Sequence, residues 1–369
     1  MSGSKVLLVS NHARIVGGGE ISLLTLLKGL KDADWEPLLF VPAEGEVATR
    51  ARALAVDVYI VPLPPIRNLP ALIPAVRDAR RQVRALAPQI MHANGSRAMF
   101  YTALAARATG CPTVWHIRIL DPDPKSDRLL ARWATASIAI SSAVRERLRP
   151  WPRAYENCRV IPNGLDLRTF VPRLARDETR VGLGAGDDAF LVTTVGRLVE
   201  FKRFDLFLEA MAIVRRKIPE LRCLIVGDGP EKPSLLERAA QEDLAGAVEF
   251  LGHRDDLPDL LAASDAFVLS SPVEGFGRVL IEAMAASLPA VAFDTAGPAE
   301  ILGDGSTGLL VEPGSAEGLA AAVARLHAAP ELRERLGTAA RRRVEERYSM
   351  EGHAKQVIGL YRDLLGGDD

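Results

Sequence analysis

Short apolar runs rich in Val, Ile and Leu recur along the chain, and a longer segment with helical spacing follows most of them. Such runs are apolar on both faces, which is typical of strands in parallel sheets covered by helices. Each half of the chain therefore predicts its own doubly wound α/β layer. The predicted strands lie at 5–10, 37–41, 56–61, 89–93, 113–117, 137–141 and 159–162, and then at 189–196, 222–227, 248–252, 266–270 and 289–293.

A stretch without strand or helix periodicity separates the halves. Residues 162–186 combine an Asn-Gly turn, prolines, glycines and charges, a mixture typical of connections between domains. We predict a Rossmann-like N-terminal domain over 1–170, a linker over 171–186, a Rossmann-like C-terminal domain over 187–349, and a closing helix over 350–369. The two domains are expected to face each other across a cleft, and ligands of such sheets bind at the carboxyl ends of the strands.

Composition narrows the class of protein to which the chain can belong. A length of 369 residues suits two domains, and a net charge of -1 from 46 Lys+Arg and 47 Asp+Glu argues against nucleic acid as a partner. Three widely spaced cysteines, Cys111, Cys158 and Cys223, indicate a reducing cytosol. Since no apolar run reaches membrane-spanning length, we expect a cytoplasmic chain with at most peripheral contact at the inner membrane face.

Two cations follow the strand predicted over 189–196. Arg197 comes directly after Gly196, and Lys202 precedes a helix. Either residue alone would more simply be a solvated loop cation. Together they are suited to hold a diphosphate and to neutralise the charge that grows on it when a glycosidic phosphate bond breaks.

The most specific run is SSPVEGFGRVLIEAMAASLPAVAF, over 270–293. Its turn carries Glu274, a carboxylate that can accept hydrogen bonds from sugar hydroxyls. The residues that follow, Gly275, Phe276 and Gly277, can present backbone N–H groups to phosphate or sugar oxygens.

Glu282 stands in the next predicted helix among apolar residues that include Val279. A pair of ribose hydroxyls would satisfy a carboxylate in that position. The alternative is an ion pair with Arg278, which we rank lower because Arg preceding Glu is the less favourable order along a helix.

The first half offers weaker candidates. Gly18 and Gly19 belong to a glycine run between the first strand and a helix, where an anion site and a simple tight turn are equally good interpretations. His116 ends the strand predicted over 113–117, and such a histidine is more often structural than catalytic. Three further polar residues could meet an anionic acceptor: Arg14, Asn94 and Arg118.

A basic segment occupies residues 69–88, with Arg77, Arg80, Arg81 and Arg84 on an amphipathic pattern. Contact with anionic lipid is one interpretation. A solvated helix face that covers a strand is the more common one.

Several enzyme classes lack support, because the chain has no GxxxxGK[ST], GxSxG, HExxH or paired CxxC motif. At this point the residues resemble the retaining, nucleotide-sugar-dependent glycosyltransferases of family four, whose fold is GT-B. The likeness runs in the family's order through 6–20, 114–118, 139–148, 160–170, 195–205, 224–231, 250–265 and 271–291.

The resemblance implies a role for each matching position. Arg197 and Lys202 would grip the donor diphosphate, and Glu274 with its turn would hold the transferred sugar. Glu282 would bind ribose, His116 would assist transfer, and the glycine run would approach the donor. The remaining donor-site positions are Val279 and the base-binding stretch 252–256, which contains His253. No metal or further cofactor is implied, because the nucleotide sugar is a co-substrate.

Three residues depart from the family pattern, since Arg203, Ser287 and Ala296 stand where glycine is usual. We predict a hexosyltransferase that uses a UDP- or GDP-sugar, with an unidentified acceptor such as a cell-envelope glycan or glycolipid precursor. One alternative is a GT-B module that binds a nucleotide sugar without turnover. An NAD oxidoreductase is disfavoured because the GxGxxG fingerprint is missing.

Overall fold

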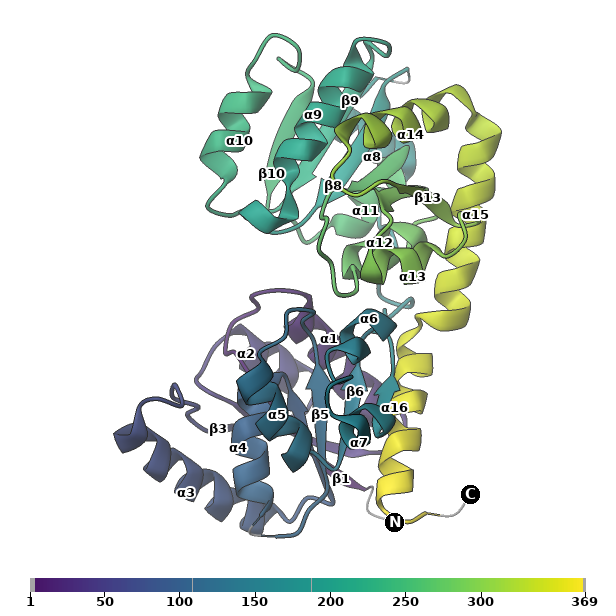
Figure 1. The fold of residues 1–369 in the computed structure, drawn as a ribbon. Helices are drawn as coiled ribbons and strands as arrows, with labels where there is room; N and C mark the ends of the chain where they lie inside the picture. Colours follow the sequence, from purple (N-terminus) through teal and green to yellow (C-terminus); the bar gives the residue numbers. More distant parts are fainter. Residues whose placement is uncertain (1–3, 108, 187, 368–369) are drawn as a thin grey trace. The chain divides into compact units, whose positions relative to one another are not determined.

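The computed structural model describes residues 4–107, 109–186 and 188–367. They form two compact units, the first within 1–164 and 350–369 and the second within 165–349. Each unit is a parallel sheet with helices around it (Figure 1). The predicted fold class is confirmed.

The first unit has a seven-stranded sheet in the order β3-β2-β1-β4-β5-β6-β7. Its strands are β1 (Lys5–Ser10), β2 (Glu36–Val41), β3 (Asp57–Ile60), β4 (Ile90–Asn94), β5 (Thr113–Ile117), β6 (Ala136–Ala139) and β7 (Cys158–Val160). Its helices are α1 (Gly18–Asp32), α2 (Glu46–Ala53), α3 (Leu69–Leu86), α4 (Ser96–Ala106), α5 (Pro124–Trp133), α6 (Ser142–Glu146), α7 (Pro152–Glu156) and α16 (Met350–Leu364).

The second unit has a six-stranded sheet in the order β10-β9-β8-β11-β12-β13. Its strands are β8 (Phe190–Val195), β9 (Leu221–Val226), β10 (Val248–Gly252), β11 (Ala266–Leu269), β12 (Ala290–Phe293) and β13 (Gly308–Val311). Its helices are α8 (Arg176–Gly182), the 3-10 turn η1 (Glu200–Lys202), α9 (Phe204–Arg215), α10 (Lys232–Ala239), α11 (Leu257–Ala263), α12 (Arg278–Ala285), α13 (Ala296–Leu302), α14 (Ala316–Ala328) and α15 (Pro330–Arg347).

Both sheets reverse their strand order beside the first strand of the unit. The reversal lies between β1 and β4 in the first unit and between β8 and β11 in the second. All of these pairs are parallel, so their carboxyl ends share one edge. A crevice outside this edge is where doubly wound sheets bind ligands.

The boundary between the units differs from the prediction. The second unit begins at Leu165, and the segment 171–186 is not a free linker because α8 lies within it. Arg176 on α8 donates hydrogen bonds to the carbonyls of Ala262 and Ser264, both at 2.7 Å. These contacts join distant parts of the chain, so no local periodicity indicates them.

The closing helix α16 returns to the first unit. Its residues Val357, Leu360 and Tyr361 are buried in the same core as Leu8 on β1 and Leu27 on α1.

Within the described part of the chain, no helix combines the length and the apolar character needed to cross a bilayer.

Candidate functional site

The carboxyl edge of β8 and β11 gathers most of the residues predicted to bind the donor. The chain leaves β8 at Gly196 and Arg197 and forms η1, which ends at Lys202. It leaves β11 at Ser270, whose hydroxyl donates to the carbonyl of Lys202 at 3.2 Å. The two loops are therefore fastened together at the point where the strand order reverses.

Lys202 forms an ion pair with Glu274 across these loops. The side chains are about one-fifth exposed, at 21% and 17%, so the pair remains open to solvent on one side. Arg197 is exposed, and its guanidinium lies 5.9 Å from the ring centre of Phe201. Two cations and a carboxylate thus surround one edge of the sheet.

The turn after Glu274 is held rigidly. Gly277 has a φ of 92°, a conformation that favours glycine, and it caps the start of α12. Phe276 is buried, with its ring centre 5.9 Å from that of Tyr348. Gly297 donates from its backbone N–H to the carbonyl of Glu274 at 3.2 Å. The backbone of Gly275–Gly277 therefore has a fixed shape next to the Lys202 pair.

Glu282 lies on α12 and is buried at 9% exposure. Arg278 donates to its carboxylate at 2.9 Å, so the ion pair that we ranked lower is formed. Burial raises the pKa of Glu282, and the charge and hydrogen bond of Arg278 oppose that rise. The ribose role stays a prediction, in which the sugar hydroxyls would join or replace Arg278.

The remaining donor-site candidates are at the rim. His253 is exposed after β10, next to the ion pair in which Arg254 donates to Asp256 at 2.8 Å. Val279 is half-buried in the first turn of α12. Neither side chain forms a polar contact in the described residues that assigns it a role.

In the first unit, polar residues join α1 to two strand ends. Gly18 and Gly19 are the first residues of α1, and the amide of Asn94 donates to the carbonyl of Gly19 at 3.3 Å. Arg118 in turn donates to Asn94 at 2.8 Å and also to Asn163. Three of the predicted acceptor-side and glycine-run residues are therefore connected.

Arg14 differs from these residues because it is exposed, and its side chain forms no hydrogen bond or ion pair with the described residues. Asn163 was not among the predicted site residues, although the Asn-Gly turn that contains it was recognised in the sequence. Its contact with Arg118 spans 45 positions, which no local signal predicts.

His116 is fully buried at the end of β5. Its Nδ1 lies 3.0 Å from Nε2 of His92, and Nδ1 of His92 lies 2.5 Å from the hydroxyl of Tyr361. Burial, and after it the charge of Arg118, holds the pKa of both histidines well below the ordinary value. The more common alternative, a hydrogen-bonded histidine inside the fold, thus describes His116 in this structure, and its role in transfer stays a prediction.

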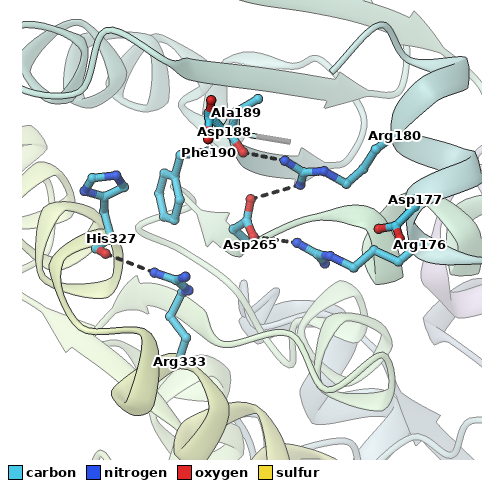
Figure 2. Close-up of a pocket in the computed structure, with 9 residues that line it drawn as sticks. All are labelled: Arg176, Asp177, Arg180, Asp188, Ala189, Phe190, Asp265, His327 and Arg333. Atoms are coloured by element: carbon cyan, nitrogen blue, oxygen red, sulfur yellow. Dashed lines mark hydrogen bonds and ion pairs between the residues drawn. The ribbon is translucent and has the colours of Figure 1, made fainter. Parts of the chain in front are cut away.

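A cavity of about 460 Å³ lies elsewhere in the second unit (Figure 2). Two of its lining residues lie where strands begin: Phe190 starts β8, and Asp265 directly precedes β11. Its arginines are already engaged, since Arg180 donates to Asp265 at 3.2 Å and Arg333 to the carbonyl of Leu326 at 2.7 Å. The cavity therefore lies at the opposite edge of the sheet from Lys202.

The cysteines show no sign of reactivity. All three are free thiols, and burial raises the pKa of Cys111 to about 11 and that of Cys158 to about 12. Among residues 4–107, 109–186 and 188–367, no group of three or more His, Cys, Asp or Glu side chains is arranged to hold a metal ion.

Comparisons with protein families match both units. The model described as glycosyl transferases group 1 matches residues 175–343, and the one described as glycosyltransferase family 4 matches residues 16–169. The first contains Lys202, Glu274 and Glu282, and the second contains the glycine run and His116.

Individual proteins show the same likeness. Alpha-D-kanosaminyltransferase of Streptomyces kanamyceticus is 29% identical over 319 residues, or 80% of this chain and 82% of the relative. The lipopolysaccharide core biosynthesis glycosyltransferase LpsE of Rhizobium meliloti is 36% identical over 186 residues, about half of either protein at 50% and 52%.

Among solved structures, Anabaena Alr3699/HepE in complex with UDP and glucose superposes with a TM-score of 0.86 and 25% identity. The match covers 98% of this chain and 100% of that one. Another structure of the same Anabaena protein contains UDP-glucose.

Proposed function

Because the chain belongs to the family-four glycosyltransferases with the GT-B fold, we propose that it transfers a hexose-type sugar from a UDP- or GDP-sugar with retention of configuration. The observation that carries this proposal is the Lys202–Glu274 pair next to the rigid Gly275–Gly277 turn, at the carboxyl edge of β8 and β11. A nucleoside diphosphate needs cations and backbone N–H donors together, and this edge offers both.

The donor is proposed to enter by exchanging partners with the ion pair. A diphosphate carries more negative charge than one carboxylate, so it would draw Lys202 away from Glu274. Glu274 would then be free to accept hydrogen bonds from the hydroxyls of the transferred sugar. Arg197, which is exposed, would be the second cation to contact the diphosphate.

Breaking the anomeric C–O bond leaves positive charge on the sugar and negative charge on the departing diphosphate. Lys202 and Arg197 would stabilise that diphosphate directly, so the proposed reaction needs no divalent metal. The acceptor hydroxyl would attack the anomeric carbon from the face that the diphosphate leaves and would pass its proton to an oxygen of the departing diphosphate, giving retention. The bound UDP and UDP-glucose of the Anabaena relative favour a uridine donor over a guanosine one.

The acceptor is proposed to be an envelope glycan or glycolipid precursor. LpsE is named for lipopolysaccharide core biosynthesis, which supports an acceptor of that class. Arg118 and Asn94 are candidates to meet it, because they stand at the carboxyl edge of the first sheet and are linked to one another. Arg14 is exposed and could reach an anionic group.

We also propose that α3 provides peripheral membrane contact. This helix packs through small residues, Ala75, Ala79 and Val83, and leaves two larger ones in solvent, Leu69 at 61% and Ile73 at 69% exposure. The same exposed side continues with the basic residues Arg77, Arg81 and Arg84. Figure 1 places α3 at the outer edge of its unit. Exposed aliphatics beside arginines suit a membrane that contains anionic lipid.

Vesicle sedimentation tests the α3 proposal. Binding to phosphatidylcholine vesicles should appear when phosphatidylglycerol is added, and should weaken in Ile73→Ser and Arg81→Glu. Arg342→Glu is a matched control, because Arg342 is equally exposed at 80% but lies on α15 in the other unit. Equal losses in Arg81→Glu and Arg342→Glu would show a general charge effect and reject α3 as the contact.

The donor proposal is tested by thermal shift and hydrolysis with UDP-, GDP-, ADP- and TDP-sugars, each with and without EDTA. One nucleotide sugar should stabilise the wild type in EDTA, and Lys202→Ala should lose that response. Lys217→Ala is the control, because Lys217 is an exposed lysine between α9 and β9, at the other edge of the sheet. Stabilisation without hydrolysis or transfer to any acceptor would favour the non-catalytic module, and no stabilisation at all would refute the donor site.

A further inference from the structure

Three side chains form a buried chain of hydrogen bonds through the first unit. They are Tyr361 on α16, His92 on β4 and His116 on β5, joined by contacts of 2.5 Å and 3.0 Å. The far ring nitrogen, Nε2 of His116, is buried and has no hydrogen-bond partner in the described part of the chain. One end of this chain of hydrogen bonds is therefore unsatisfied in the described structure.

The surroundings of the two imidazoles favour their neutral form. Burial and the neighbouring charge of Arg118 hold the pKa of each ring well below the ordinary histidine value. A neutral imidazole carries one N–H and one lone pair. Each ring therefore donates at one nitrogen and accepts at the other, so the direction of one hydrogen bond sets the direction of the next.

Only two directions are possible. If Tyr361 donates to His92, then His92 donates from Nε2 to Nδ1 of His116, and His116 carries its proton on Nε2. In the opposite direction the phenol proton of Tyr361 has no acceptor in the described structure, while Nε2 of His116 has a lone pair without a donor.

The first direction leaves one buried polar atom unsatisfied and the second leaves two. An unsatisfied buried donor or acceptor is expensive, so the first direction is favoured. In this direction one group remains unsatisfied, the Nε2–H of His116, and an oxygen atom that accepts its hydrogen bond would satisfy it.

We propose that Tyr361 and His92 are positioning residues that hold His116 in its Nε2–H tautomer, so that His116 donates a hydrogen bond to a sugar oxygen and does not act as a base. The proposal rests on the proposed function for the identity of that oxygen. It gives the closing helix a role in the reaction, since α16 supplies the hydroxyl that starts the chain of hydrogen bonds.

Packing holds that hydroxyl in place. The ring of Tyr361 lies 5.3 Å from Trp35 and 5.9 Å from His92 between centres, and the second pair meets edge to face at 85°. Tyr361 is fully buried and belongs to the core of the unit. Removing its hydroxyl therefore leaves the ring with its neighbours.

The first test uses ring ¹⁵N chemical shifts, which distinguish the two tautomers without any substrate. The chain has six histidines, so ¹⁵N-histidine labelling gives few signals, and His116→Gln assigns the one of interest. The wild type should show His116 protonated on Nε2. In Tyr361→Phe the proton should spread over both nitrogens, with the Nε2–H share falling about fivefold relative to the other tautomer.

Tyr101→Phe is the matched control, because Tyr101 is also buried and its hydroxyl donates to the carbonyl of Pro64 at 2.6 Å, outside this chain of hydrogen bonds.

Two variants of His92 give an independent test of the tautomer. His92→Gln keeps an acceptor for Tyr361 and a donor for His116, so it should retain the Nε2–H tautomer, whereas His92→Leu should lose it.

The second test is kinetic, with the donor identified by the panel above. Tyr361→Phe should lower kcat about fivefold with little change in KM, and His92→Gln should recover more activity than His92→Leu. A wild type with His116 protonated on Nδ1, or a Tyr361→Phe spectrum identical to it, overturns the proposal. A correct spectrum in a protein without transferase activity would reject the proposed function and leave the tautomer assignment standing.

Discussion

Ser287 stands at a helix end that strongly favours glycine. It follows α12 with a φ of 57°, and its N–H donates to the carbonyl of Met284 while the N–H of Leu288 donates to that of Ala283, at 3.0 and 3.1 Å. This is the Schellman pattern, in which the left-handed residue is usually glycine. We therefore predict that Ser287→Gly stabilises the second unit.

The expected size follows from two opposing effects. A non-glycine residue in the left-handed region costs roughly 1–2 kcal/mol, and glycine adds roughly 0.5–1 kcal/mol of unfolded-chain entropy. Because Ser287 is exposed and its side chain makes no hydrogen bond in the described structure, no contact is lost. The net gain is about 0.5–1 kcal/mol, which raises Tm by about 2 °C in a unit of this size.

Thermal and urea unfolding measure this gain, and Ser287→Ala separates its causes. Alanine removes the hydroxyl but keeps the Cβ, so it should give little or no stabilisation. If alanine raised Tm as much as glycine did, the backbone argument would be wrong. A change in the urea m-value would instead indicate an effect on the unfolded state.

Three further changes test packing and charge. Gly337→Ala should destabilise by about 1–3 kcal/mol, because its Cβ would lie 2.0 Å from the carbonyl oxygen of Ser287; denaturant midpoints check this. Asp127→Asn should cost about 3 kcal/mol in urea unfolding, since it breaks a fully buried pair with Arg147. Burial raises the pKa of Glu282, so its ionised form is less stable folded, and Glu282→Gln should gain Tm over wild type as pH rises above the ordinary glutamate value. That variant should also lose donor-induced stabilisation, and a constant Tm difference across pH would contradict the argument.

Most of the fold follows from the pattern of apolar runs. Every predicted strand has a counterpart among β1 to β12, and most of these strands are apolar runs buried on both faces. One strand of the structure was not predicted: β13 has four residues and begins with a glycine, so its apolar run in the sequence is short. The helix α8 was also missed, since it buries only Thr179 and Arg180 and is held by contacts with the distant Asp265.

The residues of the site could be predicted only where charged side chains follow the end of a strand. Lys202 and Glu274 were each identified from a loop, and they meet because β8 and β11 pair in parallel. Tyr361 shows the limit of this reasoning. Its place in the sequence is one apolar position of an amphipathic helix, and its contact with His92 spans 269 positions. No local pattern distinguishes its hydroxyl from those of other buried tyrosines.

The three departures from the family pattern share a structural explanation. Arg203, Ser287 and Ala296 have φ values of 51°, 57° and 23°, which L-residues rarely adopt. Glycine at these positions would therefore relieve the backbone, whatever sugar is bound. The three residues therefore share a backbone conformation that costs free energy in L-residues. The Ser287→Gly variant should accordingly keep the wild-type preference among nucleotide sugars while gaining Tm, and a changed preference would show that this turn also shapes the donor site.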